Sequence, residues 1–139
     1  AERAENQTRF IRDDVRVMVA TIAFGMGINK PDVRFVIHHD LPRNIESYYQ
    51  ESGRAGRDGE TARCTLFLGY GDIKTIEYLI DQKPNIQEQR IARQQLRQVI
   101  DFAEGTDCRR TIVLGYFGER FAGQCSGCDN CLAPKPVAD

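Results

Sequence analysis

Four cysteines have the spacing of residues that hold a metal ion. Cys125, Cys128 and Cys131 stand three positions apart in CSGCDNC, and Cys108 lies upstream of them. Thiolates suit zinc, and a closed structural zinc site takes four ligands in a tetrahedron. The short knuckle can turn three sulfur atoms toward one centre. Cys108 would supply the fourth from the start of a helix, where the thiolate form is favoured. The spacing therefore predicts one structural metal site.

Two other chemistries remain open for these cysteines. Four thiolates also hold iron–sulfur clusters, so iron is the chemical rival of zinc. The cysteines could instead be free or joined as disulfides. The N-terminus, AERAENQTRF, is polar and charged and does not resemble a secretory signal. Without such a signal, metal binding is favoured over disulfide bonding.

The stretch SGRAGRDG, residues 52–59, combines three glycines with two arginines three positions apart. Arginine presents a planar set of donors that matches phosphate oxygens in pairs. Glycines allow a close backbone approach and positive φ angles. Gln50 stands just upstream, so that Gln50, Arg54 and Arg57 could form one polar ridge facing a polyanion. The alternative is a glycine that ends a helix, followed by arginines in solvent.

A second glycine-containing loop, FGMGINKPD, follows the apolar segment VRVMVA. Ligands of open α/β sheets bind beyond the carboxyl ends of the strands. Thr21 and the amides of Gly25 and Gly27 are therefore placed to touch a phosphate. A tight loop whose glycines serve packing is the alternative. The phosphate-binding pattern GxxxxGK[ST] does not occur in the sequence, so these residues cannot bind and hydrolyse a nucleotide by the P-loop route alone.

The composition indicates a globular chain with no overall basic character. Its 139 residues are 41% hydrophobic and 28% charged, with a formal net charge of -1. This balance argues against a globally basic nucleic-acid binder, although it leaves room for a local basic site. No apolar run approaches the length needed to cross a membrane. The sequence lacks an initiating Met and opens inside a helical pattern, and we expect it to be part of a longer protein.

The elements that must position these residues change character along the chain. The first half predicts a helix at residues 1–13, a helix at 44–51 capped by Asn44, and strands at 15–20, 33–38 and 62–68. Such apolar strands suit a parallel sheet that is covered on both faces. The second half predicts helices at 72–82 and 86–104, and a third that Thr106 caps and that runs to residue 117. We place a domain boundary near residues 69–71.

Read in order, these motifs resemble the RecQ DNA helicases of superfamily 2. The segment from ATIAFGMGINKPD to ESGRAGRDG resembles their motifs V and VI. CRR, YFGE and CSGCDNC resemble the zinc-binding subdomain that follows the RecQ helicase core. The resemblance implies an α/β fold, with part of the second RecA-like parallel-sheet domain at residues 1–69. A small, mostly helical zinc-binding subdomain would follow at residues 70–139.

The resemblance also implies roles for single residues. Motif VI faces ATP across the cleft between two RecA-like domains, with an arginine finger at Arg57 and with Arg54 and Gln50 beside it. Motif V couples contact with the DNA backbone to the nucleotide site through Thr21, Gly25, Gly27, Asn29 and Lys30. The four zinc ligands would be Cys108, Cys125, Cys128 and Cys131. Cys64 matches no ligand and is expected in the core.

The implied function is that of a fragment of an ATP-dependent 3′-to-5′ DNA helicase acting in recombination and repair. It would carry one structural zinc and use ATP and Mg²⁺ in the full-length enzyme, and would be inactive without the Walker A domain. The expected partners are single-stranded DNA, duplex junctions and a single-stranded DNA-binding protein. The expected location is the bacterial cytoplasm at the nucleoid, or the eukaryotic nucleus. The alternative is a zinc-stabilised module that binds DNA or protein without ATPase activity.

Overall fold

The computed structural model describes residues 2–21, 29–121 and 123–134 and divides the chain into two compact units. The first comprises Ala1–Ile37 and Gln50–Thr65, and the second comprises His38–Tyr49 and Leu66–Asp139. The units interleave along the chain because strand β1 (Phe35–His38), helix α3 (Ile45–Ser52) and strand β2 (Arg63–Leu66) each pass from one to the other. The division expected at residue 69 stays a prediction, because these units group residues by contact alone.

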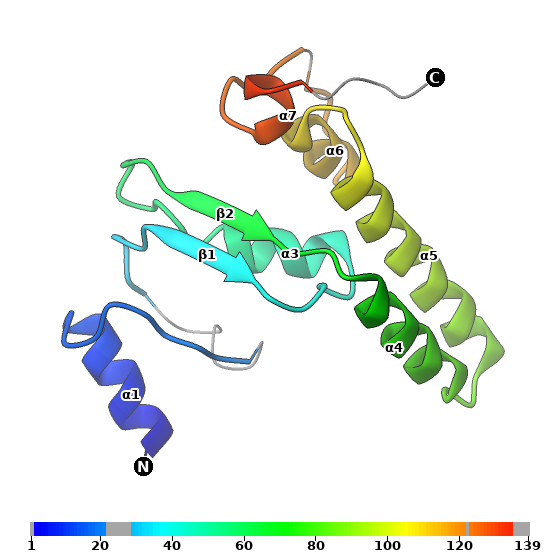
Figure 1. The fold of residues 1–139 in the computed structure, drawn as a ribbon, viewed down its shortest axis with the longest axis horizontal. Coiled ribbons are helices and arrows are strands. Elements are labelled where there is room, and N and C mark those ends of the chain that lie inside the picture. Colours follow the sequence, from blue (N-terminus) through cyan, green and yellow to red (C-terminus); the bar gives the residue numbers. More distant parts are fainter. Residues whose placement is uncertain (1, 22–28, 122, 135–139) are drawn as a thin grey trace. The chain divides into compact units, whose positions relative to one another are not determined.

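Strands β1 and β2 form a two-stranded parallel sheet. The amide of Arg63 donates to the carbonyl of Arg34 at 2.9 Å, and the amide of Phe67 donates to the carbonyl of His38 at 3.1 Å. In both bonds the donor and the acceptor are separated by the same number of residues, as parallel strands require. The two arrows run side by side in Figure 1. The strands expected at 33–38 and 62–68 are thus confirmed, although each is shorter.

The strand predicted at residues 15–20 is wrong. Helix α1 (Glu2–Ile11) ends in a turn at Asp13, whose φ is 63°, and the chain then continues to Thr21 without β pairing. Val17 and Val19 are 58% and 92% exposed. An apolar run becomes a strand only where another strand offers its donors and acceptors, and among the described residues none pairs with this run.

The second unit is helical and contains the apolar core. It consists of the first part of α3 and of α4 (Tyr70–Asp81), α5 (Ile86–Glu104), α6 (Arg109–Tyr116) and α7 (Asp129–Leu132). Figure 1 shows α4 and α5 as neighbouring helices joined by a short turn. Among the described residues, the buried apolar side chains all belong to this unit: Leu41, Ile45, Ile80, Leu96, Val99, Phe102 and Val113. None of the helices among the described residues is long and apolar enough to cross a membrane.

Local capping explains where the helices begin. The side chain of Asn44 accepts the amide of Ser47 at 2.7 Å, which confirms its predicted role before α3. Asn85 accepts the amides of Gln87 and Glu88 and so starts α5. The helix predicted to start at Thr106 instead starts at Arg109, with Cys108 as its N-cap. The Asn130 side chain explains the difference, because it donates to the carbonyls of Gly105 and Asp107 and holds this segment out of the helix.

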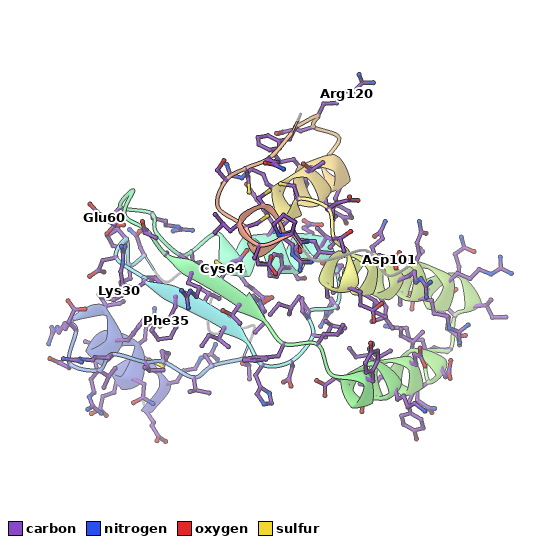
Figure 2. All side chains as sticks on the ribbon, turned by 45° about the horizontal axis from the view of Figure 1, so that its top comes forward. Lys30, Phe35, Glu60, Cys64, Asp101 and Arg120 are labelled. Carbon is purple, nitrogen blue, oxygen red and sulfur yellow. The ribbon has the colours of Figure 1, made fainter. Side chains whose placement is uncertain are left out.

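Cys64 is exposed, and its predicted place in the core is wrong. Figure 2 shows it on β2, beside β1 with Phe35. Phe35, Ile37 and Phe67 are 43%, 54% and 56% exposed, so apolar side chains of these two strands also face solvent. Two strands alone cannot bury both faces of a sheet, and an apolar strand position therefore does not imply burial here.

Candidate functional site

The four predicted ligand cysteines meet at one point. Their sulfur atoms all lie within 4.8 Å of one another, and those of Cys125 and Cys131 are 3.9 Å apart. A zinc tetrahedron with bonds of about 2.3 Å separates its sulfur atoms by about 3.8 Å. The space suits a single ion, whereas an iron–sulfur cluster must fit several iron and sulfide atoms between its cysteines. The donor set and the geometry thus fit one structural zinc.

The pKa values of the clustered thiols are shifted in opposite directions, as expected for thiols crowded around one metal site. Burial opposes ionisation of Cys108, but hydrogen bonds from the amide and hydroxyl of Thr111, from the Cys125 amide and from the Cys131 thiol together lower the pKa of this thiol to about 6. Burial raises the pKa of the Cys131 thiol to about 11, and the neighbouring Cys128 and Cys108 thiols add to this effect. Four crowded thiols cannot all lose their protons alone, whereas a divalent metal stabilises all four thiolates.

Arg109 fastens this cluster to the end of α5. Its backbone amide donates to the sulfur of Cys128 at 3.4 Å. Its guanidinium donates to the carbonyls of Phe102 and Ala103 and pairs with the Asp129 carboxylate at 3.0 Å. The guanidinium also lies 5.4 Å from the centre of the Phe102 ring. Arg109 therefore joins α5, α6 and α7 around the thiols and is not a solvated arginine.

The loop after α3 has the backbone that its glycines predict. Gly56 and Gly59 have φ angles of +66° and +84°, which side-chain-bearing residues rarely adopt. A Cβ atom at Gly56 would lie 2.9 Å from the carbonyl oxygen of Glu60, too close for any ordinary contact. This position therefore requires glycine, and the bare sequence of the loop serves a tight backbone turn.

The two arginines of this loop differ in exposure. Arg57 is exposed, and the one hydrogen bond seen for its side chain among the described residues is a long one of 3.5 Å from its Nε to the carbonyl of Gly53. Arg54 is half-buried, and Gln50 is exposed on the last turn of α3. The arrangement offers a guanidinium to an external anion at Arg57.

An ion pair that the sequence reasoning did not find holds the loop in place. Arg34, just before β1, pairs with the carboxylate of Asp58 at 2.5 Å and donates to the carbonyl of Thr61 at 3.1 Å. Asp58 also accepts the amide of Glu60 at 3.1 Å. The Arg34 hydrogen bond lowers the pKa of Asp58. The RDG sequence gave no signal for this pair, because its partner lies 24 residues upstream.

The end of the second predicted phosphate-binding stretch, FGMGINKPD, is hydrogen-bonded to this loop. The amide of Gly56 donates to the carbonyl of Val33 at 2.9 Å, and that of Asp58 donates to Pro31 at 3.0 Å. Thr21 and Asn29 are exposed, whereas Gly25 and Gly27 lie outside the described residues. The loop SGRAGRDG and the end of FGMGINKPD thus form one local structure.

Lys30 faces the protein interior, in contrast to what a DNA contact requires. Its side chain is 7% exposed and pairs with Asp13 at 2.5 Å and with Asp32 at 3.0 Å. Its ammonium also lies 5.4 Å from the centre of the Phe10 ring. The hydrogen bond with Asp13 is the main cause that raises the pKa of Lys30. The predicted coupling of Lys30 to DNA stays a prediction, but its charge is already matched inside the chain.

Comparison with known protein families matches both the part of the chain that holds the four cysteines and the part that holds the arginine loop. Residues 70–132 match the family described as RecQ zinc-binding, and residues 1–59 match the helicase conserved C-terminal domain. The ATP-dependent DNA helicase RecQ of Pasteurella multocida (strain Pm70) is 49% identical over 139 residues, which is the whole of this chain. The chain belongs to the RecQ helicase family.

Other RecQ relatives extend this match beyond one bacterium. The ATP-dependent DNA helicase RecQ of Bacillus subtilis (strain 168) is 44% identical over 99% of this chain, and ATP-dependent DNA helicase hus2/rqh1 of Schizosaccharomyces pombe is 52% identical over 94%. These matches cover 22% of the Pasteurella protein, 23% of the Bacillus protein and 10% of the yeast protein. The chain thus spans about a fifth or less of the length of these relatives.

The RecQ zinc-binding match and the four-thiol cluster assign one structural zinc to this part of the chain. Sequence reasoning found the sulfur ligands but missed their support by Arg109 and Asn130. A signal existed for each: Arg109 follows the first cysteine of CRR, and Asn130 stands between the last two cysteines of CDNC. Residues adjacent to metal ligands often hold those ligands in position.

Proposed function

We propose that this chain is part of an ATP-dependent 3′-to-5′ DNA helicase that unwinds duplex DNA in recombination and repair. Its membership of the RecQ family supports this function, and the relatives described above are named ATP-dependent DNA helicases. ATP and Mg²⁺ would bind mainly to another RecA-like domain, because the present residues contain no GxxxxGK[ST] loop. Single-stranded DNA and duplex junctions are the proposed substrates.

The exposed guanidinium of Arg57 on a fixed loop is the observation that carries this proposal. An arginine that acts on a nucleotide held by another domain must be exposed, yet its backbone must not move freely. The Arg34–Asp58 ion pair and the hydrogen bonds to Val33 and Pro31 provide that restraint. Arg57 would neutralise charge on the γ-phosphate as the bond to it breaks. Arg54 and Gln50 would lie beside it in the nucleotide site.

The zinc has a structural role in this proposal. The proposed ligands are Cys108, Cys125, Cys128 and Cys131, which together complete a four-coordinate site. Such a site has no open position for water or substrate, so the metal supplies folding energy and no chemistry. We further propose a single-stranded DNA-binding protein as a partner, and a location at the bacterial nucleoid or in the eukaryotic nucleus.

ATP hydrolysis by the intact protein that contains this chain tests the role of Arg57. We expect single-stranded DNA to stimulate hydrolysis, and Arg57→Ala to lower the turnover number by about 10³–10⁵-fold. Arg63→Ala, at an exposed arginine on β2, is the matched control and should leave turnover unchanged. Zinc content should stay at one ion per chain in both variants. Full ATPase activity in the Arg57→Ala protein would show that the proposed arginine finger is wrong.

A further inference from the structure

Two consecutive tyrosines fasten α3 to the helical unit that carries the cysteines. Tyr48 packs against the buried core, and its ring lies 5.1 Å from that of Phe102 on α5, centre to centre, and 5.3 Å from that of His38. Ile45, one helical turn earlier, is only 1% exposed. The first part of α3 is therefore held by the core that α5 helps to form.

Tyr49 makes a second attachment. Its ring lies 5.1 Å from that of Phe117, which follows α6, and Phe117 packs edge-on against Tyr116 at 5.0 Å. Successive residues of a helix point about 100° apart, so the two tyrosines reach two different neighbours. Contacts on two sides restrict the first part of α3, which belongs to the same unit as α5 and α6.

The contact made by Tyr48 continues to the metal ligands. The ring of Phe102 contacts both the ring of Tyr48 and the guanidinium of Arg109, which is 5.4 Å from its centre. The amide of Arg109 donates to the sulfur of Cys128 at 3.4 Å. A continuous chain of ring and hydrogen-bond contacts thus connects the thiol cluster to α3. All of its members belong to the second unit.

We infer that Tyr48 and Tyr49 are positioning residues that make the order of α3 depend on the metal at the four cysteines. Gln50 is on α3, and Arg54 and Arg57 follow it directly in the sequence. The consequence for catalysis rests on the proposed function of Arg57, whereas the coupling between metal and helix does not. The aromatic contacts would let a structural zinc affect ATP hydrolysis without touching the nucleotide.

Zinc affinity tests the coupling without any assay of activity. Coupling between two sites is reciprocal. If bound metal favours the ordered state of α3 by some factor, then a change that frees α3 lowers the affinity for the metal by the same factor. In the intact protein we expect Tyr48→Leu to weaken zinc binding about 10-fold in competition with a chelator, as loss of an outer contact commonly does. Tyr48→Phe keeps the ring and should bind zinc like the wild type. Unchanged zinc affinity in the Tyr48→Leu protein would overturn the inference.

Two further variants guard against a general loss of stability. Ile80→Val removes one methylene from the same core but alters no ring in the chain of contacts, and it should leave zinc affinity unchanged. Tyr49 is 49% exposed, so Tyr49→Leu should fold even if Tyr48→Leu does not. We expect Tyr49→Leu to weaken zinc binding and to speed hydrogen exchange of the α3 amides. If Ile80→Val weakens zinc binding as much as the tyrosine variants do, the rings have no specific role.

A double-mutant cycle tests whether α3 acts through Arg57. We expect Tyr48→Leu to lower turnover about 10- to 100-fold in the wild-type background, since a small misplacement of a catalytic group has an effect of this size. In the Arg57→Ala background the same change should have less than about a 2-fold effect, because the misplaced group is already absent. Equal losses in both backgrounds would overturn this role. If Arg57→Ala itself had no effect, the proposed function would fail while the zinc-affinity result still decided the coupling.

Discussion

At the scale of single residues, exposure separates arginines that the sequence presents as alike. Each of these arginines directly follows a motif residue: Arg57 follows a glycine and Arg109 follows a cysteine. The guanidinium of Arg109 is bound to two carbonyls and a carboxylate, whereas that of Arg57 makes one long hydrogen bond to a carbonyl within the part of the chain that the structure describes. A guanidinium whose N–H groups are bound inside the protein has few donors available for a phosphate. We therefore assign the external role to Arg57 and the internal role to Arg109.

Lys30 provides a prediction at this scale. Replacement by Met keeps the length of the side chain but leaves the Asp13 and Asp32 carboxylates without their cation. Because both carboxylates are partly solvated, we expect a loss of about 1 kcal/mol in the free energy of unfolding. A domain of this size should then melt about 3–5 °C lower. Thermal unfolding of the intact protein measures this change.

Lys74→Met is the control for Lys30→Met, because Lys74 is exposed on α4 and forms no ion pair with any residue that the structure describes. It should leave the melting temperature unchanged. If Lys30→Met melts like the wild type but binds single-stranded DNA more weakly, the lysine serves DNA as the sequence pattern predicts. The internal role would then be wrong.

At the scale of elements, the sequence predicts structure well where the determinants are local. Helix α5 occupies Ile86–Glu104, the same residues that its apolar period and the following glycine predict. The three cysteines of the knuckle also meet, because their spacing alone brings them together. The apolar run at residues 15–20 fails as a strand, because a strand needs a partner that the run itself does not specify. The placement of Cys64 in the core fails similarly, and the burial of Lys30 could not be foreseen, since burial depends on what packs against a residue from elsewhere.

The Arg34–Asp58 pair predicts how the arginine loop responds to acid. The hydrogen bond from Arg34 lowers the pKa of Asp58 in the folded protein. A lowered carboxyl pKa stabilises the fold above the ordinary value of about 3.9, and this stabilisation is lost as the pH falls through the lowered value. We therefore expect the loop to stay ordered from neutral pH to about pH 5 and to loosen below about pH 4. The NMR signals of the Gly56 and Gly59 amides, followed against pH, report this change.

Asp58→Asn is the matched variant for the acid response. The amide oxygen can still accept the hydrogen bond from the Glu60 amide, but the side chain no longer titrates and attracts Arg34 less. We expect the loop in this variant to be looser at neutral pH and to lose most of its response to acid. An acid transition that remains the same in the Asp58→Asn protein would assign the response to another group.

At the scale of the whole molecule, the two units differ in what stabilises them. The described core, from Leu41 to Val113, lies entirely in the second unit, which also holds the four cysteines. Only two of its side chains, Ile45 and Val99, are less than 2% exposed. Small domains with so few fully buried side chains often depend on a metal for their stability. The cysteine spacing alone could not reveal this, because it says nothing of how small the surrounding core is.

Cys128→Ser tests this dependence on the metal. The serine hydroxyl can accept the amides of Arg109 and Cys131 as the sulfur does, but it is a far poorer zinc ligand than a thiolate. We expect the variant to lose zinc and the second unit to lose its resistance to proteolysis. Structural zinc is worth about 10 kcal/mol or more in small zinc domains, which is as much as a whole domain's stability.

Cys64→Ser separates the metal site from cysteine chemistry in general. Cys64 is the one cysteine of the five that lies outside the cluster, and it is exposed. This variant should keep one zinc per chain and resist proteolysis like the wild type. Removing zinc from the wild-type protein with a chelator should reproduce the Cys128→Ser result, and adding zinc back should reverse it. If α5 and α6 stay protected from proteolysis after zinc is lost, the apolar core is sufficient and the metal is not what holds this unit together.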